Sequence, residues 1–243
     1  MNVVAIIQAR TGSTRLPNKI FSKLSGFNLL HHVVDRLKPS KEINKIVIAT
    51  TTSIKDNSVE DWCIDNNLDF YRGSEKNVLK RYYEAAKEFK AEIIIRVTAD
   101  DPFKDYRIID KAINILKENK FDFVCNNNPV SFPEGLDVEV LTMYALSNSF
   151  FNSTSSFEQE HVTQYIHRNK KNFKIFNIKN NKDLSYFRWT IDTNEDYLFV
   201  KEVYNNLYKK NNIFLPEDIY ELLEKKPLLL KINSEVKKSD LYK

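Results

Sequence analysis

Short apolar runs rich in β-branched residues alternate with amphipathic segments through the first half of the chain. The runs at residues 3–8, 45–51, 92–98 and 121–126 are continuous enough to be strands buried on both faces. The segments at 29–37, 58–66, 77–89 and 106–118 carry apolar residues at the i, i+3, i+4 spacing of helices. This alternation predicts an α/β chain with a three-layer αβα architecture and a mostly parallel sheet.

The second half of the chain is less regular. Strands are expected near 136–141, 173–178 and 187–191, and helices near 143–150 and 158–168, then from Glu195 and from Pro216. No repeat and no linker rich in Pro, Gly or Ser divides the 243 residues, so we expect a single domain over 1–243. Mixed strand pairing in this half predicts a small accessory segment around 130–180, a candidate arm for substrate binding or dimerisation.

Composition excludes several classes of protein. The longest apolar runs fall far short of the roughly 20 residues that cross a bilayer, and no basic segment precedes the first apolar run, so neither a membrane span nor a secretion signal is expected. Cys63 and Cys125 stand alone, as in a reducing cytoplasm. The 37 basic residues only slightly exceed the 33 acidic ones and form no stripe, so nucleic acid is not an expected partner.

The loops that follow the strands are where function is expected, because ligands bind beyond the carboxyl ends of open parallel sheets. Three of the four glycines of the chain, Gly12, Gly73 and Gly135, lie in polar loops. In a chain so poor in glycine, these positions indicate a positive φ or the close approach of a ligand.

The loop after the first predicted strand carries three cations and no acid. Arg10, Arg15 and Lys19 surround Gly12, together with small hydroxyl residues such as Ser13. Such a loop offers a polyphosphate fixed backbone donors, two guanidinium groups and an ammonium group. Its spacing fits neither a Walker loop nor a dinucleotide-binding fingerprint. A solvated basic loop is the alternative interpretation.

Carboxylates follow two other predicted strands. Asp100 and Asp101 end the third strand, where they could hold Mg²⁺ or, alternatively, cap the next helix. Asp192 ends a later strand, and Thr193 or Asn194 can cap the helix that follows it. Since the cap does not need Asp192, this residue and Asp100 could together clamp one Mg²⁺ ion.

A fourth polar stretch lies at residues 132–140. Asp137 and Glu139 share one face of an alternating strand there, which is ordinary on a solvated edge but could bind hydroxyl groups if it faces a cleft. His161 lies on a predicted helix beside Glu160, where a lone histidine is more often a polar neighbour than a catalyst.

Taken together, these motifs resemble the cytidylyltransferases that make CMP-activated sugars, among them the acylneuraminate and 3-deoxy-manno-octulosonate enzymes. The likeness is greatest to the branch named after spore coat polysaccharide biosynthesis protein F. It extends over nearly the whole chain, and the segments that carry it, in order, are 8–19, 48–52, 71–74, 77–83, 132–140, 160–163 and 188–193.

The resemblance implies a Rossmann-like nucleotidyltransferase fold and a set of site residues. The catalytic group is Arg10, Arg15, Lys19 and Asp100, and Asp100 and Asp192 hold Mg²⁺. The nucleotide-binding group is Ala9, Arg10, Gly12, Ser13, Arg15, Lys19, Thr50, Thr51, Thr52, Arg72, Gly73 and Ser74. The group that faces the sugar acceptor is Glu134, Asp137, Glu139, His161 and Arg188.

Two positions depart from the family pattern. Asn18 replaces the glycine often found before the signature lysine, and Ala99-Asp100-Asp101 stands where the branch tends to have Gly-Asp-Cys. The second departure leaves open which neighbouring carboxylate is the metal ligand, and the match to the motif favours Asp100.

The expected activity is transfer of CMP from CTP to an acidic or phosphorylated sugar, with release of pyrophosphate, for the synthesis of a surface polysaccharide or glycan. A homodimer is expected by analogy with relatives. If a sugar hydroxyl attacks, Asp101 or a metal-bound water could serve as the base. The alternatives are a glycosyltransferase that uses a nucleotide sugar and a non-catalytic nucleotide-binding protein.

Overall fold

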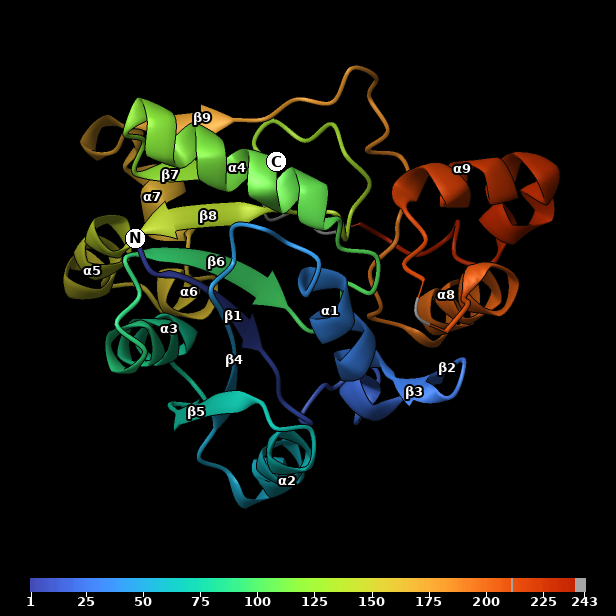
Figure 1. Ribbon diagram of the computed structural model, residues 1–243, viewed down its shortest axis with the longest axis horizontal. Helices are drawn as coiled ribbons and strands as arrows, with labels where there is room; N and C mark the ends of the chain where they lie inside the picture. The colour runs from blue at the N-terminus through green and yellow to red at the C-terminus, as the bar shows by residue number, and fades with distance from the viewer. Residues whose placement is uncertain (211, 239–243) are drawn as a thin grey trace.

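A seven-stranded sheet forms the centre of the molecule (Figure 1). The computed structural model describes residues 1–210 and 212–238. The strand order is β5-β4-β1-β6-β8-β7-β9, and only β8 runs antiparallel to its neighbours. The strands of this sheet are β1 (Val3–Gln8), β4 (Lys45–Thr51), β5 (Asp69–Gly73), β6 (Ile93–Thr98), β7 (Phe123–Cys125), β8 (Glu139–Thr142) and β9 (Ile175–Asn177). A separate hairpin pairs β2 (Lys23–Leu24) with β3 (Phe27–Asn28).

Helices cover both faces of the sheet, because its central strands are apolar on both sides. In β1, Val3, Ala5 and Ile7 enter one buried cluster, and Val4 and Ile6 enter the other. The helices of the first cluster are α1 (Leu29–Leu37), α2 (Asn57–Asp65), α4 (Tyr106–Asn119), α8 (Asn194–Leu207) and α9 (Pro216–Lys225). Those on the other face are α3 (Val78–Glu88), α5 (Met143–Asn152), α6 (Ser156–Glu160) and α7 (Gln164–Arg168). Short 3₁₀ turns are η1 (Lys19–Phe21), η2 (Ile54–Asp56), η3 (Lys170–Asn172) and η4 (Pro227–Lys231).

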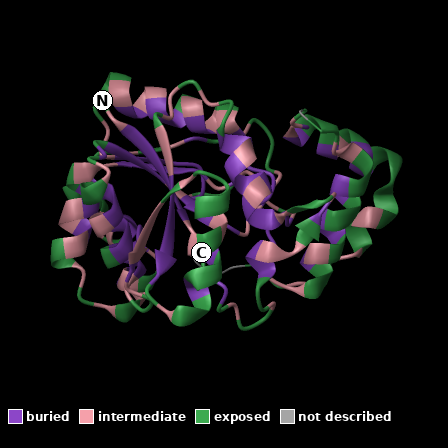
Figure 2. Cartoon of the chain, turned by 60° about the horizontal axis from the view of Figure 1, so that its bottom comes forward, coloured by how far each residue is buried: buried purple, intermediate pink, exposed green. Residues whose placement is uncertain are grey.

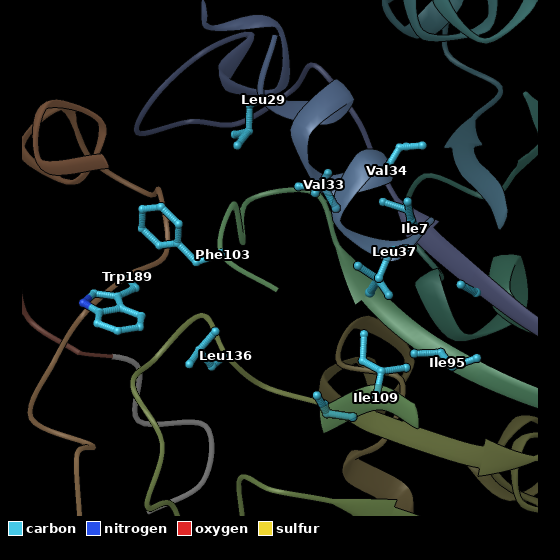
Figure 3. Packing of buried hydrophobic residues seen from close by; sticks show 14 of the residues in the cluster. Ile7, Leu29, Val33, Val34, Leu37, Ile95, Phe103, Ile109, Leu136 and Trp189 are labelled. Atoms are coloured by element: carbon cyan, nitrogen blue, oxygen red, sulfur yellow. The ribbon is translucent and has the colours of Figure 1, made fainter. Parts of the chain in front are cut away.

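The first cluster continues past the sheet into the C-terminal helices. Phe103, in the loop after β6, packs edge-to-face on Trp189 at 5.9 Å between ring centroids, and both side chains are fully buried. Figure 3 shows these two rings near Leu136. The burial colouring of Figure 2 shows the buried strands at the centre and the exposed outer faces of the helices. Through this packing, α8 and α9 lie beyond the carboxyl edge of the parallel strands (Figure 1).

The predicted three-layer fold with a mostly parallel sheet is confirmed. Two second-half predictions were wrong in detail. Residues 187–191 form no strand and make only an isolated bridge, between Glu134 and Arg188, because their backbone hydrogen bonds go to two different loops, at Glu134 and at Asp100. The helix expected at 158–168 is two short helices, α6 and α7, separated at Val162, whose φ of 51° is left-handed. The strand β5 was not predicted.

The segment around 130–180 is integrated into the main sheet. It supplies β8 and β9, and its helices α5, α6 and α7 lie on the face opposite α4. Its proposed part in acceptor binding or dimerisation stays a prediction.

No helix within residues 1–210 and 212–238 is long and apolar enough to cross a bilayer.

Candidate active site

The loop after β1 is anchored at one end and exposed in its middle. The backbone N–H and the hydroxyl of Thr11 both donate to Asp56 Oδ1, at 2.7 and 2.8 Å, and Asp56 also accepts from the Thr51 hydroxyl. These bonds tie the loop to η2. Arg10 and Arg15 are exposed, and the Arg15 guanidinium lies 3.2 Å from Asp192 Oδ2.

Asn18 turns the chain back toward the interior. Its φ of 57° and ψ of 21° are left-handed, a conformation that glycine adopts freely and asparagine tolerates better than most residues. Asn18 therefore adopts a backbone conformation that a glycine at this position could also adopt. The turn places the next residue, Lys19, in η1 with its side chain pointing inward.

The Lys19 ammonium lies between the two carboxylates predicted to act together. Nζ is 2.7 Å from Asp100 Oδ2 and 2.9 Å from Asp192 Oδ1, and it also donates to the carbonyl of Ile191 at 2.8 Å. Burial alone would lower the pKa of Lys19, but the two carboxylates outweigh it and raise this pKa above its ordinary value. The same contacts hold the pKa of Asp100 below its ordinary value despite the cost of burial.

Asp100 and Asp192 converge on one cation, and that arrangement fits a divalent ion as well. In the described part of the chain, no three His, Cys, Asp or Glu side chains cluster as a metal site. An ion here would therefore need phosphate oxygens or water to complete its oxygen ligands. The alternative that Asp100 or Asp101 caps the next helix is wrong, because Asp105 caps α4 and accepts from Arg107 N–H at 2.9 Å.

Arg188 contacts Asp192 at Oδ2, the oxygen that Lys19 does not bind. Its guanidinium is buried and lies 2.9 Å from Asp196, 2.8 Å from Glu134 and 3.1 Å from Asp192. Thr193 caps α8 in a capping box with Asp196, so Asp192 is indeed free of the cap. This places Arg188 beneath the site as a positioning residue.

Two pockets meet at Asp100. The smaller, of about 220 Å³, is formed mainly by the first loop, and Gln8, Arg10, Ser13, Thr14, Arg15, Lys19, Ile20, Thr98, Ala99 and Asp100 line it. The larger, of about 360 Å³, lies on the other side of Asp100 and Thr98 and is lined in addition by Arg96, Asp101, Lys104, Val130, Phe132, Glu134, Gly135, Asp137, Glu139, Ser185, Thr190, Asp192 and Lys238.

Asp137 and Glu139 both line the larger pocket, as expected if this alternating stretch faces a cleft. Leu136 and Val138 are buried in the core, whereas Asp137 lines the pocket. Glu139 also lines it but is 2% exposed and is held by Arg96 at 2.5 Å and by the Thr163 hydroxyl at 2.7 Å. The Arg96 charge outweighs burial and keeps the pKa of Glu139 well below its usual range.

Several predicted nucleotide-site residues lie at the same sheet edge without lining the smaller pocket. Arg72 donates to the carbonyls of Thr51 and Ser53, each at 2.9 Å, and pairs with Glu60. Ala9, Thr50 and Thr51 are buried, Thr52 is exposed, and Ser74 accepts from Asn77 N–H at 3.0 Å. Their contact with the nucleotide stays a prediction.

Two other predicted positions also lie away from the pockets. Gly73 leaves no room for a Cβ, which would lie 2.8 Å from the Tyr71 ring. His161 packs on Phe157 at 4.6 Å and is not among the residues that line the larger pocket. Its role with the acceptor stays a prediction.

The sequence analysis did not identify several residues of the site. Lys104 is 2% exposed and lies 2.8 Å from Asp101, three positions earlier, yet nothing separates it in the sequence from the many solvated lysines. Asp56 was missed because it acts on a loop 45 residues away, and Asp196 because its contact with Arg188, eight residues earlier, forms only when the chain folds. For Lys104, the available signal in the sequence was its spacing of three from Asp101.

The fold and the site define a nucleotidyltransferase of the α/β class. A cytidylyltransferase family profile matches residues 4–236. The chain is 37% identical to an uncharacterized protein of Methanocaldococcus jannaschii over 98% of its length and 96% of that protein. It is 32% identical to the spore coat polysaccharide biosynthesis protein SpsF of Bacillus subtilis over 93% of its length and 95% of that protein.

A solved structure agrees with these matches. A cytidylyltransferase from Leptospira borgpetersenii superposes with a TM-score of 0.91 at 33% identity, covering 98% of this chain and 100% of that one. The chain therefore belongs to the cytidylyltransferase family, within the group that makes CMP-activated sugars.

Proposed function

We propose that this cytidylyltransferase transfers CMP from CTP to an acidic or phosphorylated sugar and releases pyrophosphate, for the synthesis of a surface polysaccharide or glycan. The observation that carries the proposal is the position of Asp100, Lys19 and Asp192 where the two pockets meet. A cationic loop on one side suits a triphosphate, and a polar pocket on the other side suits a sugar.

Nucleotidyl transfer asks the protein mainly to position and neutralise charge. An acceptor oxygen attacks the α-phosphorus in line, and the bond to the bridging oxygen breaks as pyrophosphate leaves. Arg10, Arg15 and Lys19 neutralise the charge that builds on the leaving group. Asp100 and Asp192 would hold Mg²⁺, which supplies Lewis-acid stabilisation of phosphate charge when bound.

An acidic or phosphorylated acceptor would contact the cations of the larger pocket, whose lining also carries six carboxylates. Arg96, Lys104 and Lys238 all line it, opposite the smaller pocket across Asp100. Arg96 and Lys104 are fixed by Glu139 and Asp101, so their positions are set before a ligand arrives.

The first test measures the shift in melting temperature with CTP, UTP, GTP and ATP, each with and without Mg²⁺. A shift confined to CTP and enlarged by Mg²⁺ supports the proposal, and pyrophosphate release with sugar acids then completes the test. Stabilisation by nucleotide sugars and not by CTP would point instead to a glycosyltransferase. Light scattering tests the proposed homodimer, and cell fractionation tests the proposed cytoplasmic location.

The matched variants are Asp100→Ala and Asp192→Ala. Each should abolish Mg²⁺-dependent turnover while the far-ultraviolet circular dichroism stays unchanged, because each removes half of the carboxylate pair. Wild-type turnover in both variants would remove the metal assignment.

A further inference from the structure

Six carboxylates line the larger pocket, and five of them are held by cations. They are Asp100, Asp101, Glu134, Asp137, Glu139 and Asp192. Lys19 and Arg188 each hold two of them, with Asp192 shared between the two cations, and Lys104 and Arg96 hold one each. Asp137 differs from the rest: over residues 1–210 and 212–238 it makes no ion pair within 4.0 Å.

Asp137 is held by the backbone instead. Its Oδ2 accepts from Gly135 N–H at 3.3 Å, and its own carbonyl accepts from Lys104 Nζ. Lys104 therefore binds the backbone of Asp137 and the carboxylate of Asp101, and it forms no salt bridge with the carboxylate of Asp137. Asp137 lines the pocket. An acid so placed can form a new hydrogen bond to a ligand without first breaking an ion pair.

Burial makes Asp137 a better proton acceptor than an ordinary aspartate. Burial raises its pKa to about 6; Lys104 opposes this shift, and Asp101 and Glu139 add to it. A base with this pKa is ionised at neutral pH and still holds a proton more strongly than a solvated carboxylate does.

Asp101, the other candidate base, is committed elsewhere. Its Oδ2 accepts from the Thr98 hydroxyl at 2.6 Å and lies 2.8 Å from Lys104 Nζ, and the residue is 4% exposed. Burial raises the pKa of Asp101 as well, but a proton on this carboxyl would remove the charge that holds the buried Lys104, so we assign Asp101 to fixing Lys104.

We propose that Asp137 is the general base that takes the proton of a hydroxyl acceptor. This inference rests on the proposed function. The hydroxyl O–H bond breaks, its proton moves to the Asp137 carboxylate, and the oxygen forms a bond to the α-phosphorus. The bond from that phosphorus to the bridging oxygen breaks, and pyrophosphate leaves with the electron pair. A phosphate nucleophile is already ionised and would need no such base.

The test compares Asp137→Asn with Asp137→Glu, using Asp65→Asn as the matched control, because Asp65 is exposed at the end of α2. Pyrophosphate release is measured with CTP and Mg²⁺ across pH 5 to 9. The probes are 3-deoxy-manno-octulosonate and water as hydroxyl nucleophiles, and glucose 1-phosphate as a phosphate nucleophile.

Asp137→Asn should lower kcat by about 100-fold or more, with little change in the KM for CTP. The fall in wild-type rate below pH 6 should disappear in this variant and return, at reduced rate, in Asp137→Glu. Asp65→Asn should match the wild type.

Three results would overturn the inference. The first is a rate for Asp137→Asn within threefold of the wild type; the second is an acid limb retained in that variant. The third is wild-type turnover of glucose 1-phosphate alone. If wild-type protein released no pyrophosphate and CTP gave no thermal shift, the proposed function itself would fall, and the inference with it.

Discussion

At the scale of single residues, Lys19 sets the charge balance of the site. Its ammonium is the one group that contacts both Asp100 and Asp192 in the described chain. Without it, Asp100 would lose its ion pair, and Asp192 would keep its contacts with Arg15 and Arg188. This makes the lysine both a catalytic candidate and a stabilising residue.

Lys19→Met should therefore lower the free energy of unfolding by about 3 kcal/mol, which for a chain of this size is a melting temperature roughly 6–12 °C lower. Mg²⁺ should restore more stability to the variant than it adds to the wild type, because the competing ammonium is gone. Calorimetry with and without Mg²⁺ checks both effects. An equal response to Mg²⁺ in the two proteins would show that the ion does not bind between these carboxylates.

Asp137 should lower stability in the pH range where it ionises. Its pKa is about 6 when folded and 3.8 as the ordinary value, so the folded state retains a proton that the unfolded chain loses. Wild-type stability from this group is complete below pH 3.8 and is lost as the pH rises to 6. Asp137→Asn should thus exceed the wild type in stability by about 3 kcal/mol above pH 6. Urea unfolding at pH 4 and pH 8 checks this, and a difference independent of pH contradicts it.

The sequence predicted which charged residues form the site better than it predicted which residues each of them contacts. Asp100, Asp192 and Lys19 were each identified, but their mutual contact depends on a turn at Asn18 whose left-handed backbone is read only from the structure. Arg188 was expected to face the acceptor and instead lies buried among carboxylates. Partner choice is set by tertiary packing, which a single sequence does not specify.

At the scale of elements, Gly135 joins the loop before β8 to the segment after residue 187. Its φ is 104°, and a Cβ there would lie 2.8 Å from the carbonyl carbon of Trp189. Two backbone bonds complete the junction, Glu134 N–H to Phe187 at 3.1 Å and Trp189 N–H to Glu134 at 2.7 Å. The junction brings the chain that carries Asp137 against the chain that carries Asp192.

Gly135→Ala should destabilise the protein more than Gly26→Ala does. Gly26, in the hairpin turn between β2 and β3, has a similar φ of 95°, but a Cβ there meets nothing within 4 Å. Its variant bears only the backbone strain of about 1–3 kcal/mol, whereas Gly135→Ala also collides with backbone. Thermal unfolding of both variants checks the difference. Equal losses would mean that the junction can move apart freely.

The elements that sequence periodicity predicted are those buried in the sheet and its helices. β1, β4 and α1 match their predicted ranges because each has a long apolar pattern. β5 was missed because Asp69–Gly73 is short and its outer residues are partly exposed. The break between α6 and α7 occurs at Val162. This β-branched residue has a left-handed backbone conformation that local sequence preferences disfavour, so the break was not predicted. Val162 sits beside Thr163, whose hydroxyl meets the buried Glu139.

At the scale of the whole molecule, the site lies between the carboxyl edge of the sheet and the segment that leads into α8. The strands β1 and β6 supply Gln8 and Thr98 at the carboxyl edge of the sheet. The segment before α8 supplies Asp192, and Ile191 N–H donates to the Asp100 carbonyl at 2.9 Å. A ligand that fills the two pockets would therefore contact both the sheet edge and the segment that leads into α8.

Binding of CTP with Mg²⁺ should accordingly slow hydrogen exchange in two distant stretches, residues 10–18 and 188–193. The first is an exposed loop with few backbone hydrogen bonds, so it opens at low cost in the free protein and gains most from a ligand. The second should follow, because its Asp192 shares the bound charge with Asp100. Exchange in α5, on the opposite face, should stay unchanged. Protection confined to 10–18 would mean that the nucleotide binds to the sheet edge alone and that Asp192 serves only to hold Lys19.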